Sequence, residues 1–150
     1  MKIKKQISYF FPTLLLLLCT SFPQTIKENW IKVINNNDYK IYINESNITD
    51  SHGDDIYVWV MEDHSEPISL EGIEGEITQI RTYYLLNHKK MRYSILQVIY
   101  YDKDKNVLKS FSYEHNSNIT NFRYSAPILK NTDIETILTK CLEIERPDKN

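Results

Sequence analysis

A single helix-like segment near the C-terminal end follows a series of strand-like runs, and this order restricts the fold sharply. Ile134, Ile137, Leu138, Cys141 and Leu142 recur at the spacing that places apolar side chains on one face of a helix. An amphipathic helix must bury that face, and the partner available in this chain is a sheet built from the preceding strands. The pattern predicts an α+β fold in which the helix packs on one face of an antiparallel sheet, with Cys141 buried as a packing residue.

Thr132 and Glu135 have the spacing of a capping box, which predicts the start of this helix. In such a box the threonine oxygen accepts a hydrogen bond from the backbone near the glutamate. The glutamate carboxylate reaches back to the N–H of the threonine. Pro147 is expected to close off the helix.

Runs rich in aromatic and β-branched residues occupy the middle of the chain and predict strands. We expect these strands over residues 30–34, 39–43, 55–61, 77–87, 91–102 and 106–114. Polar turns separate them at residues 35–38, 88–90 and 102–105, and one helical turn is expected near residues 46–49. The acidic segment 62–76 contains proline and two glycines, so it is predicted to be the longest mobile loop. Residues 115–131 are expected to be irregular.

Both faces of the predicted sheet are apolar, although one helix can cover only one of them. In the run 56–61, Tyr57 and Trp59 alternate with aliphatic residues. Simple alternation along 91–102 places Tyr93, Ile99 and Tyr101 together on one face. The uncovered face is therefore expected to expose aromatic and aliphatic side chains, as partner or dimer interfaces do. The alternative is that loops such as 62–76 fold over it.

Residues 1–21 have the layout of a secretory signal peptide, with a basic start and an apolar run over residues 7–18. That run is shorter than the about 20 residues that a membrane-spanning helix needs. Cleavage after Ser21 would leave one exported domain over residues 22–150, in the periplasm, at the outer membrane surface or outside the cell. Lipidation of Cys19 would tether the protein to a membrane, but Leu18 stands where a lipoprotein signal requires a small residue.

Composition excludes several function classes. Without the signal peptide the chain is acidic, and nucleic-acid binding requires a basic face, so we expect no nucleic-acid partner. Only 3 glycines occur in 150 residues, which argues against a loop that cradles phosphate. No serine lies at a hydrolase-type elbow, and Cys141 lies on the helix stripe, so no catalytic residue is predicted. We expect no enzyme activity and no cofactor.

Metal sites are also not expected. The four histidines fall in predicted loops, and no pair has metal-ligand spacing; a site from His64, His115 and nearby carboxylates remains an alternative. The residues Asp102, Asp104 and Asn106 resemble the start of a calcium loop. The chain lacks the glycine and the bidentate glutamate that such a loop requires, so a hairpin turn is the preferred interpretation.

Lys89, Lys90 and Arg92 form a concentrated basic patch at a predicted hairpin tip. In an acidic domain such a tip can contact an acidic partner, a glycan sulfate or a phospholipid headgroup. A solvated turn is the alternative interpretation.

The order of elements resembles the surface-adhesin protein E family of bacterial exported proteins. The resemblance rests on Trp30 at the first strand, on the runs 39–43, 58–60, 92–95 and 100–102, and on Cys141 in the terminal helix. It implies a curved antiparallel sheet of about six strands with a C-terminal helix on its concave side. It also implies adhesion to host matrix or serum proteins, which some members show. The family commonly pairs the helix cysteine with one near the middle of the chain. Residues 86–88 hold none here, which implies a helix held by apolar burial alone.

The leading hypothesis is a small exported, non-enzymatic, adhesin-like protein that engages a host matrix or envelope protein, with a homodimer also possible. The family's basic segment corresponds to Lys89, Lys90 and Arg92, and the aromatic sheet face contributes Tyr57 and Trp59 as binding residues. One alternative is an inhibitor or accessory factor of an envelope or host enzyme, whose loop 62–76 plugs an active site. Another is a small ligand-binding or hydrolytic domain.

Overall fold

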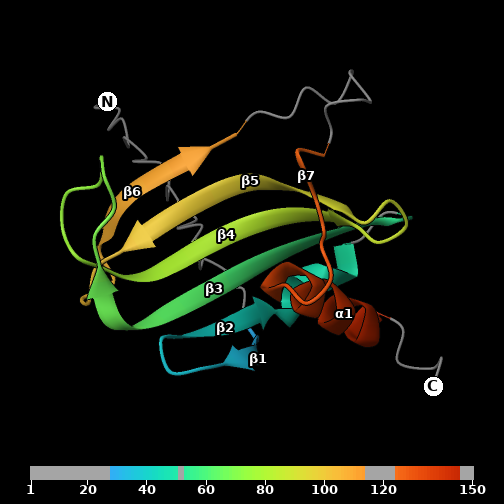
Figure 1. Cartoon of the computed structure of the whole chain (residues 1–150), viewed down its shortest axis with the longest axis horizontal. Helices are drawn as coiled ribbons and strands as arrows, with labels where there is room; N and C mark the ends of the chain where they lie inside the picture. Colours follow the sequence, from blue (N-terminus) through green and yellow to red (C-terminus); the bar gives the residue numbers. More distant parts are fainter. Residues whose placement is uncertain (1–27, 51–52, 114–123, 146–150) are drawn as a thin grey trace, which may run out of the picture.

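The computed structural model describes residues 28–50, 53–113 and 124–145. Six antiparallel strands form an open sheet in chain order, and one helix follows them (Figure 1). The strands are β1 (Trp30–Asn35), β2 (Tyr39–Asn44), β3 (Asp55–Ile68), β4 (Ile77–Asn87), β5 (Arg92–Tyr101) and β6 (Val107–Ser112). A short strand β7 (Ala126–Pro127) pairs with β5, the 3-10 helix η1 is Glu45–Asp50, and the helix α1 is Asp133–Glu145. The predicted α+β fold with a six-stranded antiparallel sheet is confirmed.

Short polar side chains close three of the hairpin turns. The Asn36 side-chain oxygen accepts from the N–H groups of Asp38 and Tyr39 at 3.0 and 2.8 Å. The Asn87 oxygen accepts from the N–H of Lys90 at 2.7 Å. Asp102 accepts from the backbone of the turn that follows it, with 2.8 Å to the N–H of Asn106. In each turn, the side chain of an asparagine or aspartate bonds the backbone of the turn and so stabilises it. The Asp102 contacts confirm that residues 102–106 form a hairpin turn.

The prediction of a long loop over residues 62–76 is wrong, because β3 continues to Ile68 and only residues 69–76 connect it to β4. Glu62 and His64 pair with β2, opposite Ile41 and Tyr39, so this acidic stretch is held by strand neighbours. Pro67 lies where the β3–β4 register shifts, and a proline is tolerated at such an irregularity. His64 therefore lies in a strand and not in a loop.

A bulge in β5 overturns the simple alternation expected over residues 91–102. Tyr83 pairs with Gln97 and Tyr84 pairs with Ile95, so Leu96 is an extra residue between them. One extra residue reverses the side on which the following side chains point. Tyr93 consequently lines the helix side of the sheet, whereas Ile99 and Tyr101 lie on the opposite side.

The helix α1 packs on one face of the sheet, as predicted. Ile137, Leu138 and Cys141 are buried in a core with side chains from β2, β3 and β4, and Ile48 of η1 joins them. Cys141 is a free thiol with 0% exposure, and burial, with the nearby Glu145 carboxylate, raises its pKa to about 12. No disulfide ties α1 to the sheet within the described residues, so apolar packing holds it there.

The start of α1 differs in detail from the predicted capping box. The Glu135 carboxylate accepts from the N–H of Asn131 at 2.7 Å, one residue before the expected donor. Asn131 has a left-handed backbone with a φ of 60°, and this turn brings its N–H to the first helical turn. The Thr132 hydroxyl instead donates to the carbonyl of Leu129 at 2.7 Å.

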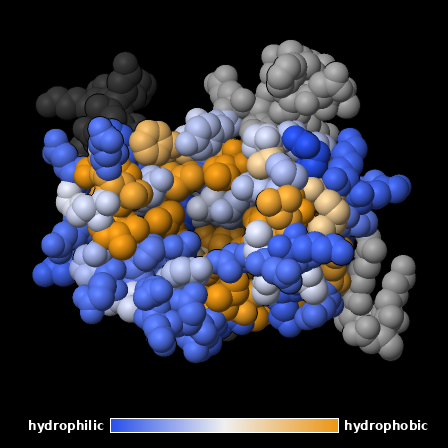
Figure 2. Space-filling view, in the orientation of Figure 1, coloured by the Kyte–Doolittle hydropathy of each residue, from blue (hydrophilic) through white to orange (hydrophobic). Residues whose placement is uncertain are grey.

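The helix covers only part of its face of the sheet. In Figure 1, α1 lies in front of the β1–β3 side, and the β4–β6 side has no helix in front of it. Figure 2 shows the same side of the molecule, where apolar residues gather around a hollow. The predicted signal peptide, with Cys19, lies outside the described residues, as do His52 and His115.

Candidate binding surfaces

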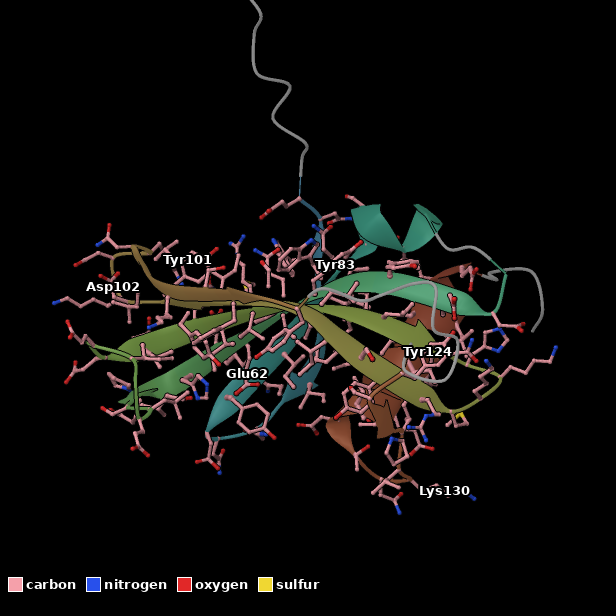
Figure 3. The ribbon with its side chains drawn as sticks, turned by 90° about the horizontal axis from the view of Figure 1, so that it is seen from above. Glu62, Tyr83, Tyr101, Asp102, Tyr124 and Lys130 are labelled. Atoms are coloured by element: carbon pink, nitrogen blue, oxygen red, sulfur yellow. The ribbon has the colours of Figure 1, made fainter. Side chains whose placement is uncertain are left out.

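Strand pairing gathers aromatic side chains on the sheet face opposite α1. Trp59 pairs with Tyr83, Met61 with Arg81, and Gln79 with Tyr101, so these side chains point to one side. Figure 3 shows Tyr83 and Tyr101 on the side away from α1, and Glu62 on the α1 side. We call this surface the aromatic face and define it by Trp30, Tyr57, Trp59, Arg81, Tyr83, Ile99 and Tyr101.

The rings of the aromatic face pack on one another. Trp59 stacks on Tyr83 with ring centroids 4.9 Å apart and an interplanar angle of 18°. Tyr57 also adjoins Tyr83, with ring centroids 6.2 Å apart. Because each ring shields its neighbour, these side chains are half-buried rather than freely exposed. The arrangement is a platform of packed aromatic rings.

Arg81 is held between two further rings at the edge of this platform. Its guanidinium carbon lies 5.2 Å from the ring centroid of Trp30 and 5.3 Å from that of Tyr101. Its Nη1 lies 3.4 Å from Glu28, a separation that allows only a weak ion pair. The Trp30 indole N–H donates to the same carboxylate at 2.9 Å. A hollow of about 320 Å³ opens beside these groups and Trp59.

Tyr57 and Trp59, both predicted as binding residues, therefore lie together on the uncovered face. Sequence reasoning missed Arg81, Trp30 and Tyr101 as their neighbours. The sequence did hold one signal, because Arg81 is a charged residue within a strand rich in aromatic residues. Only the strand register shows that aromatic rings lie around it. The loop over residues 69–76 lies at one end of the sheet in Figure 1 and not over its middle.

The basic hairpin tip is present but lies apart from the aromatic face. Six residues along β4 separate Asn87, next to the tip, from Arg81, which corresponds to about 20 Å at 3.3 Å per residue. Lys89 is exposed, with 74% of its side chain accessible, and its Nζ lies 3.6 Å from Asp54. The tip and the platform are separate surfaces.

The other two basic residues hold a later segment of the chain. Lys90 Nζ lies 5.1 Å from the ring centroid of Tyr124, and Arg92 donates to the Tyr124 carbonyl at 3.1 Å. The Tyr124 hydroxyl donates to the buried carboxylate of Asp55, which also accepts from Asn87 at 2.6 Å. Lys90 and Arg92 thus have structural partners, and sequence reasoning missed this buried network.

Of the four histidines, the structure describes His64 and His88. His64 Nε2 lies 2.8 Å from Glu62 without hydrogen-bond geometry, and His88 lies 3.7 Å from Asp54. Among the described residues, no group of three or more His, Cys, Asp or Glu side chains has the arrangement of a metal site. The alternative site that combined His64 with His115 rests partly on a residue outside the described ranges.

Comparison with models of known protein families identifies the family of this chain. The model of the family described as surface-adhesin protein E matches residues 30–140, well over half of the 150-residue chain. The chain belongs to the surface-adhesin protein E family. Membership supports an adhesin-like surface protein and implies an exported or surface location. Searches of curated proteins and of solved structures gave no significant match. No helix in the part of the chain that the structure describes is long and apolar enough to cross a membrane.

Proposed function

We propose that this protein is a non-enzymatic adhesin that binds a host matrix or envelope protein through its aromatic face. One observation carries the proposal: Arg81 is held between Trp30 and Tyr101, beside the Trp59–Tyr83 stack, on a sheet face that α1 leaves uncovered. Tryptophan, tyrosine and arginine dominate the binding energy of protein interfaces. Because these side chains already pack together, a partner would lose little affinity to side-chain ordering.

The basic tip contributes to recognition in a different way. Lys90 and Arg92 contact Tyr124, whereas Lys89 has 74% of its side chain accessible and a surface ion pair with Asp54 at 3.6 Å, so we take Lys89 as the cation that meets a partner. An exposed charge at an interface rim mainly affects the association rate and its salt dependence. We infer that Lys89 steers an acidic partner, whereas the aromatic face holds it.

The structure removes the long loop on which the inhibitor hypothesis was based. It required a long loop over residues 62–76, and residues 62–68 belong to β3. The remaining connection over residues 69–76 lies at the end of the sheet in Figure 1. Adhesion is therefore the function that the geometry favours.

Binding to a panel of immobilised matrix and serum proteins tests this proposal. Trp59→Ala and Arg81→Ala should each weaken binding to any captured protein by roughly tenfold or more, the effect of losing a hot-spot residue. Phe111→Ala is the matched control, because Phe111 is 38% exposed on β6 and lies outside the aromatic face. Circular dichroism verifies that each variant is folded. If folded Trp59→Ala and Arg81→Ala variants bind as tightly as the parent, the aromatic face is not the binding surface.

A further inference from the structure

A second hollow lies on the other side of the sheet, beside α1. It has a volume of about 540 Å³, within the range of ligand sites. Its floor is the sheet, its wall is the first turns of α1, and its rim is the segment before that helix. Figure 2 shows apolar residues around this hollow. We call it the helix-side groove.

Apolar atoms contribute slightly more than half of the groove surface, and polar atoms contribute the rest. Ile80 and Tyr84 of β4 contribute to the floor, and Ile134 of α1 contributes to the wall. Leu129 lines the rim, and 60% of it is exposed to solvent. A segment with aliphatic side chains would remove this surface from water.

Two carboxylates interrupt the apolar lining, and they face the same space. Glu62 lies on β3 and Asp133 at the first residue of α1. Burial raises the pKa of Glu62, and the charge of Asp133 raises it further, while His64 acts in the opposite direction. Asp133 accepts a hydrogen bond from the Tyr39 hydroxyl at 2.7 Å, a neutral partner. No lysine or arginine is present among the described residues that line the groove.

We propose that the helix-side groove binds a cationic, apolar peptide segment of a partner protein, in which a lysine or arginine is flanked by aliphatic side chains. The stem of such a residue packs on the apolar floor while its charged end meets the two carboxylates. An incoming cation also offsets the repulsion between Glu62 and Asp133. This site is independent of the aromatic face, which is on the opposite side of the sheet.

Fluorescence polarisation with short labelled peptides tests the chemistry of the site. The full chain is titrated against three probes: Leu-Lys-Leu-Lys-Leu, Leu-Gln-Leu-Gln-Leu and Leu-Glu-Leu-Glu-Leu. The lysine peptide should bind at least tenfold more tightly than the glutamine peptide, and the glutamate peptide more weakly still. Added salt should weaken the lysine peptide selectively, because screening acts on the charge contribution. Equal binding of the lysine and glutamine peptides would overturn the proposal.

Matched variants locate the site. Glu62→Gln should weaken the lysine peptide by roughly fivefold or more. Glu66→Gln should leave its affinity within twofold, because Glu66 is exposed on the same strand and does not line the groove. The two variants have the same net charge, so a general electrostatic effect would change both equally and would contradict the proposal. Leu129→Ser should weaken the lysine and glutamine peptides to a similar degree, since it removes apolar contact only.

NMR supplies a readout that does not depend on the variants. Both tryptophans of the chain, Trp30 and Trp59, belong to the aromatic face, so their indole N–H signals report on that surface. The lysine peptide should shift the methyl signals of Ile80 and Ile134 and leave the indole signals unchanged. Shifts of the indole signals with unchanged isoleucine methyl signals would assign the peptide to the aromatic face and refute a site in the groove. These peptide measurements report on the helix-side groove alone, so their outcome does not depend on whether the aromatic face binds a matrix protein.

Discussion

Replacing Leu138 by alanine should loosen the attachment of α1 to the sheet. Leu138 is 3% exposed and belongs to the core between α1 and the strands. The change removes three carbon atoms from the core, which costs about 2.4 kcal/mol at about 0.8 kcal/mol per methylene. A residual cavity adds to that loss, so we expect a total of about 3 kcal/mol, within the range measured for buried leucines.

Cys141 allows this loss to be measured at the helix itself. It lies one turn after Leu138, is fully buried, and its raised pKa of about 12 leaves almost no thiolate at neutral pH. A thiol reagent therefore reacts when α1 leaves the sheet. Cys19→Ser makes Cys141 the sole thiol of the chain, which has 2 cysteines. Because about 1.4 kcal/mol corresponds to a factor of ten, Leu138→Ala should accelerate labelling roughly a hundredfold.

Thr139→Ala provides the control on the same helix. Thr139 is exposed, and its hydroxyl donates only to the carbonyl of Glu135 at 2.9 Å. Labelling in this variant should stay within about threefold of the parent rate, since surface substitutions change stability by about 0.5 kcal/mol or less. If Leu138→Ala also stays within that limit, apolar packing is not what holds α1 in place.

Three further changes test other parts of the structure. Tyr124→Phe removes the hydroxyl that donates to the buried Asp55 carboxylate, so the free energy of unfolding in urea should fall by about 1–3 kcal/mol; an unchanged midpoint would contradict the network. Gly75→Ala should lower the thermal midpoint, with a cost of about 1 kcal/mol or more, because Gly75 has a φ of 106° and an added Cβ would lie 3.0 Å from Leu108. Glu62→Gln should raise the thermal midpoint at pH 7 and leave it unchanged near pH 4. Because the pKa of Glu62 is raised in the folded state, protonated Glu62 contributes its full stability below the ordinary pKa of 4.5. That stability is lost as the pH rises through the folded-state pKa, whereas glutamine stays neutral. An equal or lower midpoint for the variant at pH 7 would show that ionised Glu62 is not destabilising.

Local sequence signals were sufficient for most elements of the fold. The strand expected over residues 77–87 agrees with β4, and the strand expected over 39–43 ends one residue before β2 does. The turn side chains Asn36 and Asp102 act within a few residues of their own positions, so their neighbours in sequence reveal them. The apolar stripe of α1 is likewise a local pattern, and the need to bury it predicted where the helix packs.

The candidate sites were harder to predict from the sequence than the fold, because they depend on the register between strands. Tyr57 and Trp59 were predicted as binding residues from alternation along one strand. Their contact with Arg81 requires the pairing of β3 with β4 and of β4 with β5. A single bulge at Leu96 decides which of the β5 side chains join the aromatic face. Such an irregularity has no local signature that alternation can detect.

The sequence by itself determined the kinds of elements, their order and the face that the helix must bury, since these follow from the chemistry of neighbouring residues. Tertiary structure decided the continuation of β3 to Ile68, the ring pair around Arg81, and the meeting of Glu62 with Asp133 at one groove. Each of these joins residues far apart in the chain. Their energies depend on strand register and on packing across the sheet, which exist only after the chain has folded.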